Sequence, residues 1–240
     1  MKFSGFAGNV VMFTLVKNHQ KSVHPAITQK VFIKSSAKST KLMNFNWLEL
    51  LINVPAALIA ITVHEFFHAY AAVKMGDRTP ELHGRLSLNP LNHLDPIGTI
   101  MLILFRFGWA KPVPINPYNF KDYKKGTVIV SLAGPLSNLG LAFVSSLLRR
   151  LIVPFGLGYL DLFIQTLIFI NIALAIFNLI PIPPLDGSRL LILVTPPKYE
   201  YILNWLERFG FMIIIIIIAF TPLIDLVVGP ITMFFFNLFL

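Results

Sequence analysis

The sequence contains no cysteine and few charged residues. The lack of cysteine excludes disulfide bonds, a thiolate nucleophile and any metal site with thiolate ligands. Any bound metal must therefore be held by histidine or carboxylate side chains, which favours zinc or a similar ion. Only 13% of the 240 residues are charged, against about 25% in soluble domains, while 55% are hydrophobic and the mean hydropathy is +0.72. These values are typical of a protein that crosses a membrane several times.

Acidic residues are absent from residues 1–46, which contain seven lysines. Most of the formal net charge of +9 arises in this basic leader, so the charge does not indicate a nucleic-acid-binding face. The leader has three interpretations: an organellar transit peptide, a cytoplasmic tail held near anionic lipid, or upstream or disordered sequence before a true start at Met43. The third is favoured, because the leader has no hydrophobic periodicity. We expect a multi-pass protein of the cell membrane, or of an organellar membrane if the leader is a transit peptide.

Apolar segments follow the leader, and they predict an all-α polytopic membrane protein with about five to six transmembrane helices. The predicted spans are 50–73, 128–148, 161–183 and 211–226, and the segment 229–240 is apolar but short. Segment 97–108 is shorter than the ~20 residues that a crossing needs. It is predicted either to cross with its flanking residues or to form a re-entrant or β-hairpin element. The predicted domains are the leader 1–46 and a membrane domain 47–240, with a motif-bearing core 47–190 and anchor spans within 209–240.

Lysines and arginines do not settle the orientation of these spans. Lys121, Lys124 and Lys125 precede the span 128–148, whereas Arg149 and Arg150 follow it. The positive-inside rule therefore leaves open which end of the bundle faces the cytoplasm.

An H-E-x-x-H motif lies within the first predicted span, at His64, Glu65 and His68. On a helix the two histidines are four residues apart, so both imidazoles project from one face and can share a metal ion. Glu65 can then act as general base toward a metal-bound water. Charged groups in lipid cost about 2.5–3.5 kcal/mol each on insertion scales, so three polar residues in one turn need a common partner. The alternative is that both histidines bond to neighbouring helices and that Glu65 is a neutral, buried acid.

Two histidines leave a tetrahedral zinc site short of at least one ligand. The candidates for the third ligand are His83, His93, Asp77, Glu81, Asp95 and Asp186. All except Asp186 lie in the polar connection 74–95, where polar residues are ordinary. Asp186 lies instead in the segment N-L-I-P-I-P-P-L-D-G at 178–187, whose prolines cannot sustain a helix. Unwound backbone at membrane depth is tolerated where it is buried in protein or lines a water-filled cavity, so this segment offers water a route to a metal.

Several motifs together resemble the site-2 protease family of intramembrane zinc metalloproteases, in a short form without a PDZ or CBS domain. Besides H-E-x-x-H and the segment 178–187, they are N-P-L-N-H-L-D-P-I-G at 89–98, G-W-A-K-P-V-P at 108–114 and A-G-P-L-S-N at 133–138. The resemblance covers about residues 47–190. The C-terminal spans match the family in hydrophobicity alone, and residues 1–46 do not match it.

This resemblance implies one zinc ion per chain, held by His64, His68 and Asp186, with Glu65 activating the water. It also implies that Asn178 lies near the scissile peptide and stabilises the oxyanion. The implied substrates are transmembrane segments of other membrane proteins, cleaved within the lipid bilayer in regulated intramembrane proteolysis; no nucleic acid is involved.

A substrate helix satisfies its own backbone hydrogen bonds, so it must unwind locally before it is attacked. We hypothesise that the connection 74–95, which contains Gly76, Pro80 and Gly84, acts with segment 97–108 as a gate or as an edge that holds the extended substrate.

Two other functions compete with proteolysis. One is a metal-handling or transport protein that uses histidine and aspartate as ion ligands along a path. The other is a non-catalytic relative that binds transmembrane helices. Glu65 discriminates between them, because a hydrolase needs its carboxylate and a transporter needs only the metal ligands.

Overall fold

The fold is described from a computed structural model, in residues 47–99, 110–220 and 224–240. These ranges are mostly helical and contain no strand beyond a single antiparallel β-bridge between Leu94 and Ala110, which agrees with the all-α class. The α-helices are α3 (Trp47–Met75), α4 (Thr79–Leu82), α6 (Tyr123–Ile152), α7 (Gly158–Asn178), α8 (Glu200–Phe220) and α9 (Gly229–Phe239). The 3-10 helices are η1 (Pro90–Asn92), η2 (Pro117–Asn119), η3 (Val153–Phe155), η4 (Asp186–Leu193) and η5 (Pro197–Tyr199), and η6 (Ile224–Val228) is a π-helix.

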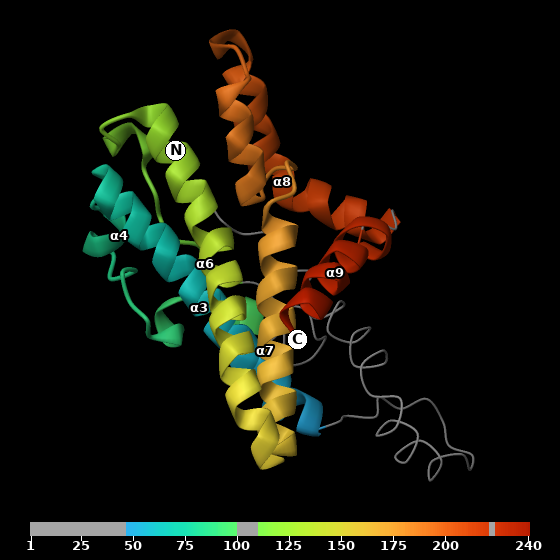
Figure 1. Cartoon of the computed structure of the whole chain (residues 1–240). Helices are drawn as coiled ribbons and strands as arrows, with labels where there is room; N and C mark the ends of the chain where they lie inside the picture. Colours follow the sequence, from blue (N-terminus) through green and yellow to red (C-terminus); the bar gives the residue numbers. More distant parts are fainter. Residues whose placement is uncertain (1–46, 100–109, 221–223) are drawn as a thin grey trace.

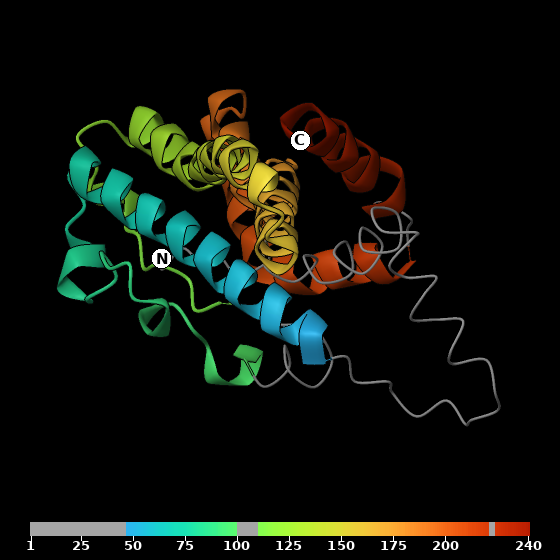
Figure 2. The same cartoon turned by 60° about the horizontal axis from the view of Figure 1, so that its bottom comes forward.

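Three long helices form the core of the molecule. Helix α3 packs against both α6 and α7, and α6 lies beside α7 along most of its length, while α9 covers another side of α7 (Figures 1 and 2). Helix α7 is the most enclosed of the three, with an unbroken buried stretch from Ile164 to Ala175. On α3, the alanines Ala56, Ala57 and Ala60 are fully buried. Their small side chains let the backbones of the neighbouring helices approach α3 closely.

Three helices in the described ranges are long and apolar enough to cross a membrane: Leu50–Met75, Tyr123–Phe155 and Gly158–Asn178. They agree with a multi-pass membrane protein, whereas the total of five to six spans stays a prediction. The predicted span 161–183 is too long at its C-terminal end, since α7 stops at Asn178. Pro181 and the prolines after it disfavour helical geometry in the residues before them and lack the amide hydrogen that a helix needs. Helix α8 begins at Glu200, well before the predicted residue 211.

Several predictions fall outside the described ranges. The leader 1–46 and its three interpretations lie there, as does most of segment 97–108 with its re-entrant or β-hairpin element. At its borders, the bridge between Leu94 and Ala110 and the hydrogen bond from Lys111 N–H to the His93 carbonyl (2.8 Å) bring the two flanking chains together.

The connection after α3 is organised by one buried carboxylate. Asp77 is 0% exposed and accepts hydrogen bonds from the Asn116 N–H (2.7 Å), Asn119 Nδ2 (2.8 Å) and Thr79 Oγ1 (2.5 Å). The Lys121 N–H also donates to the last residue of α3, Met75, at 3.0 Å. These bonds tie the segment before α6 to the C-terminal end of α3, and so fix residues 110–116 alongside the helix that carries the H-E-x-x-H motif.

Candidate metal centre

The two motif histidines lie on the buried face of α3. His64 and His68 are each 4% exposed, and their side chains contact α6 and η4 inside the molecule. The four-residue spacing places them one turn apart, as the sequence predicts. Phe67 and Tyr70, on another face of the same helix, are exposed, so the helix divides into a polar interior site and an apolar outer surface.

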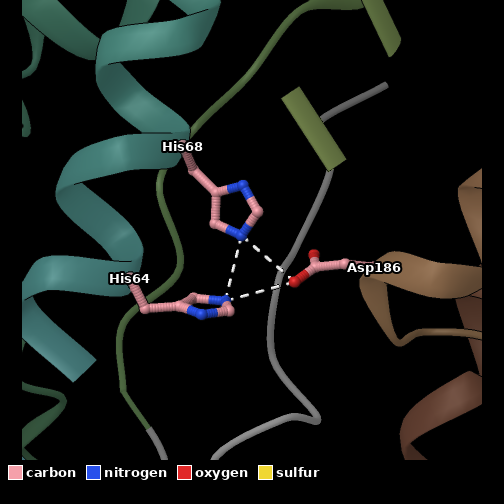
Figure 3. A group of neighbouring side chains, drawn as sticks. All are labelled: His64, His68 and Asp186. Carbon is pink, nitrogen blue, oxygen red and sulfur yellow. Dashed lines mark hydrogen bonds and ion pairs between the residues drawn. The ribbon is translucent and has the colours of Figure 1, made fainter. Parts of the chain in front are cut away.

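Asp186 completes a compact group with the two histidines (Figure 3). Its Oδ2 lies 3.1 Å from His64 Nε2 and 3.1 Å from His68 Nε2, and the two Nε2 atoms are 3.0 Å apart. The aspartate is 3% exposed and opens η4, directly after the proline segment. The unwound backbone therefore delivers a carboxylate to histidines that precede it by more than a hundred residues.

The hydrogen bonds of Nδ1 in the two imidazoles leave Nε2 as the nitrogen that faces Asp186. His64 Nδ1 lies 2.6 Å from Asn138 Oδ1, and His68 Nδ1 lies 2.7 Å from the Val130 carbonyl oxygen. A carbonyl oxygen only accepts, so in each ring Nδ1 carries the proton and the neutral imidazole has its lone pair on Nε2. Three acceptors, two nitrogen lone pairs and a carboxylate oxygen, then converge on one point. A metal cation at that point would bind all three.

The size of the cluster fits zinc. In a tetrahedral site with ligands about 2.0–2.1 Å from the metal, neighbouring ligand atoms are roughly 3.3 Å apart. The observed separations of 3.0–3.1 Å are close to this value, and nitrogen and oxygen donors suit the ion. Three protein ligands leave a fourth position open, which is the pattern of catalytic rather than structural zinc sites.

Glu65 lies on the same turn but is not part of the cluster. It is 2% exposed, and its Oε2 accepts a hydrogen bond from the Val113 N–H at 3.2 Å. The segment 110–116 therefore fixes one carboxylate oxygen of Glu65 near the candidate ligands His64 and His68. A carboxylate in this place can take a proton from a water bound at the open position.

Comparisons with known proteins place the chain in a family. A family model described as "Peptidase family M50" matches residues 154–217. The relative "Putative zinc metalloprotease YwhC" of Bacillus subtilis is 41% identical over 180 residues, which are 72% of this chain and 82% of the relative. The chain belongs to peptidase family M50. The resemblance to site-2 proteases seen in the sequence is thereby confirmed.

Two further relatives of this M50 peptidase carry similar names. "Putative zinc metalloprotease Rip2" of Mycolicibacterium smegmatis is 32% identical over 174 residues, 70% of this chain and 66% of the relative. "Putative zinc metalloprotease MJ0611" of Methanocaldococcus jannaschii is 32% identical over 151 residues, 62% of this chain and 73% of the relative. No solved structure matches the chain.

The other candidate ligands of the M50 peptidase are engaged elsewhere. His83 is exposed and bonds to the Thr79 carbonyl, His93 donates from Nε2 to the Ser87 carbonyl, and Glu81 pairs with Arg78. Asp77 organises the loop described above, and Asp95 accepts from the Gly98 N–H. Within the described ranges, His64, His68 and Asp186 are the group placed to share an ion.

Asn178 ends α7 and is buried, with its Nδ2 donating to the Leu174 carbonyl at 2.9 Å. The structure thus places this side chain at the point where the helix gives way to the proline segment. Its contact with a scissile peptide, and a role at the oxyanion, stay predictions.

Two glycines permit close approaches that the sequence alone did not explain. A Cβ on Gly134 of α6 would clash with His68 Nε2 and would lie 2.7 Å from His64 Nε2, which is also too close. A Cβ on Gly187 would collide with the carbonyl of Leu179 and would lie 2.8 Å from that of Ile180. The first glycine lets α6 pass directly beside the metal ligands. The second lets η4 fold back onto the end of α7, which is how Asp186 reaches them.

A buried arginine also borders the site. Arg85 is 4% exposed, and its guanidinium donates to the carbonyl of Lys111, two residues before the N–H that binds Glu65. Burial lowers the pKa of Arg85, and the negative charge of Glu65 offsets part of this effect. The arginine therefore holds segment 110–116 in place and lies within electrostatic reach of the glutamate. Sequence reasoning missed it, because an arginine in a polar connection carries no sign that it is buried.

Proposed function

We propose that this chain is an intramembrane zinc endopeptidase, which hydrolyses peptide bonds within the transmembrane segments of other membrane proteins. The observation that carries the proposal is the convergence of two Nε2 lone pairs and one carboxylate oxygen inside a helical bundle with three membrane-length helices. Membership in peptidase family M50 makes the chain a zinc metalloprotease. His64, His68 and Asp186 hold the ion, and the protein is a multi-pass membrane protein.

The chemistry follows from the arrangement of the side chains. His64, His68 and Asp186 would hold the zinc ion, which would supply a water activated as a nucleophile at neutral pH. Glu65 would take a proton from the attacking water and deliver it to the leaving amine, so it would serve as general base and then as general acid. The hydrogen bond from Val113 N–H holds one carboxylate oxygen, which leaves the other oxygen for the reaction.

The depth of the site supports an intramembrane substrate. At 1.5 Å per residue, His68 and His64 lie about 10 and 16 Å along α3 from its end at Met75, well inside a helix long enough for an ~30 Å hydrocarbon core. A substrate helix that reaches this depth must first unwind, because its peptide groups are otherwise bonded to each other. We retain the connection 74–95, with segment 97–108, as the hypothesised edge or gate for the unwound substrate.

The proposal is tested with the purified full chain and a single-span membrane protein reconstituted together in lipid vesicles. Products are mapped by mass spectrometry, before and after zinc is removed with a chelator and restored. We expect cuts within the apolar span of the substrate that stop on zinc removal and return with zinc. Cuts confined to the water-exposed parts of the substrate, or cleavage that survives zinc removal, would contradict the proposal.

A further inference from the structure

A chain of side-chain hydrogen bonds links the metal ligand His64 to the two other core helices. Asn138 of α6 accepts from His64 Nδ1 at 2.6 Å, and its own Nδ2 donates to Asn171 Oδ1 on α7 at 2.7 Å. Both asparagines are 0% exposed. We call this pair of amides the Asn138–Asn171 relay. It crosses α3, α6 and α7 at the level of the metal ligands.

The orientation of both amides is fixed by backbone carbonyls, which only accept hydrogen bonds. Asn138 Nδ2 also donates to the Ala60 carbonyl at 3.0 Å, and Asn171 Nδ2 donates to the Leu167 carbonyl at 2.8 Å. Each amide Nδ2 therefore donates to a backbone carbonyl. Asn138 Oδ1 must then face His64 Nδ1, and Asn171 Oδ1 must face Asn138 Nδ2. It follows that His64 carries its proton on Nδ1.

Asn171 places a polar amide deep inside the molecule. Asn171 lies toward the middle of α7, an apolar helix of membrane-spanning length that is mostly buried inside the molecule. Polar side chains in such spans are costly and are generally tied to function. Within the described residues, the Asn171 side chain donates to the Leu167 carbonyl of its own helix and accepts from Asn138 Nδ2 on α6. The hydrogen bond to Asn138 therefore explains why an amide occupies position 171.

We propose that Asn138 and Asn171 are positioning residues that hold His64 in the Nδ1-protonated tautomer, with the Nε2 lone pair directed at the metal. This inference rests on the proposed zinc-dependent function. Hydrogen bonds to the outer nitrogen of a ligating histidine fix its tautomer and raise its basicity, and their loss lowers metal affinity about 10–100-fold. Asn171 acts through Asn138, because it restrains the amide that would otherwise turn about its last side-chain bond.

The test compares zinc affinities, measured on the full chain in detergent by competition with a chromophoric chelator. Asn138→Leu removes the acceptor at similar volume, and we expect zinc affinity to fall about 10–100-fold. Asn138→Asp keeps an acceptor for His64, and we expect an affinity nearer to that of the wild type. Asn171→Leu should cost several-fold, and the double variant should bind zinc no more weakly than Asn138→Leu, since both changes break one path.

The matched control is Thr166→Val on α7. Thr166 is buried and bonds to its own helix at the Leu162 carbonyl, away from the relay, so this change should leave zinc affinity unaltered. The visible spectrum of the cobalt-substituted protein gives a second readout, which should shift in Asn138→Leu and not in Thr166→Val. If Asn138→Leu does not fold, Asn171→Leu carries the test by itself.

Three results would overturn the inference: wild-type zinc affinity in Asn138→Leu or Asn171→Leu, equal losses in the Leu and Asp variants of position 138, or additive losses in the double variant. These outcomes are distinct from failure of the proposed function. A wild-type chain that binds no zinc refutes the proposed function, whereas a wild-type chain that binds zinc as tightly as Asn138→Leu refutes the relay alone.

Discussion

Gly134→Ala is expected to abolish stable zinc binding, although it adds a single methyl group to a helix. The new Cβ would clash with His68 Nε2 and lie only 2.7 Å from His64 Nε2, so either α6 moves away or the imidazoles turn. Both responses separate the ligand atoms. We expect a loss of zinc affinity greater than the roughly 10–100-fold typical of changes outside the ligands themselves. Elemental analysis of the purified variant measures the loss.

Gly140→Ala is the matched control, on the same helix and with the same added methyl. A Cβ there meets nothing within 4 Å, and the residue is exposed. Replacing a mid-helix glycine by alanine stabilises a helix by roughly 0.5–1 kcal/mol where there is room. The control should therefore keep its zinc and unfold at the same temperature as the wild type or a slightly higher one. Equal zinc contents in the two variants would show that the close approach of α6 does not matter.

Glu65→Gln should remove cleavage and leave the metal in place. The substitution keeps the size of the side chain and an oxygen for the Val113 N–H, but it removes the base that takes the proton from the water. General acid–base groups contribute typically about 10²–10⁴-fold to rates, so we expect kcat to fall by that factor with KM little changed. The measurement is the rate of cleavage of a single-span substrate at saturating concentration.

The control for this variant is Asp122→Asn, which lies outside the hypothesised substrate gate. Asp122 is exposed and caps α6 by accepting from the Lys125 N–H at 2.9 Å, and asparagine caps a helix about as well as aspartate. This change should leave the rate unchanged. Full proteolysis by Glu65→Gln would rule out the proposed mechanism, and would favour a protein that binds metal for another purpose.

The parts of the site that the sequence predicts are those with local or motif-based signals. The spacing of His64 and His68 is one helical turn, and any helix through this segment puts both imidazoles on one face. Asp186 stands out because prolines unwind the chain just before it. The same prolines also explain why α7 ends before the predicted residue 183. The residue before a proline avoids helical geometry, and Pro181 therefore predicts an end before Ile180 rather than at residue 183.

The remaining parts depend on contacts between segments that are distant in the sequence. Asn138 lies within a motif shared with the site-2 protease family, but nothing in the motif shows that its oxygen meets His64. Asn171 carried one usable signal, an amide in the middle of an apolar span, which sequence reasoning did not use. Arg85 and Val113 carried none. Their roles follow from the path of residues 110–116 beside α3, which is fixed by the buried carboxylate of Asp77.

The central claim, that His64, His68 and Asp186 hold a catalytic zinc, is tested most directly by the zinc content of the full chain purified without chelator. Elemental analysis should find one zinc per chain in the wild type and in Glu65→Gln, and almost none in His68→Ala. The exposed His83, changed to alanine, should leave the zinc content at one per chain. A wild-type protein without zinc, or a His68→Ala protein that retains one zinc per chain, would contradict the account.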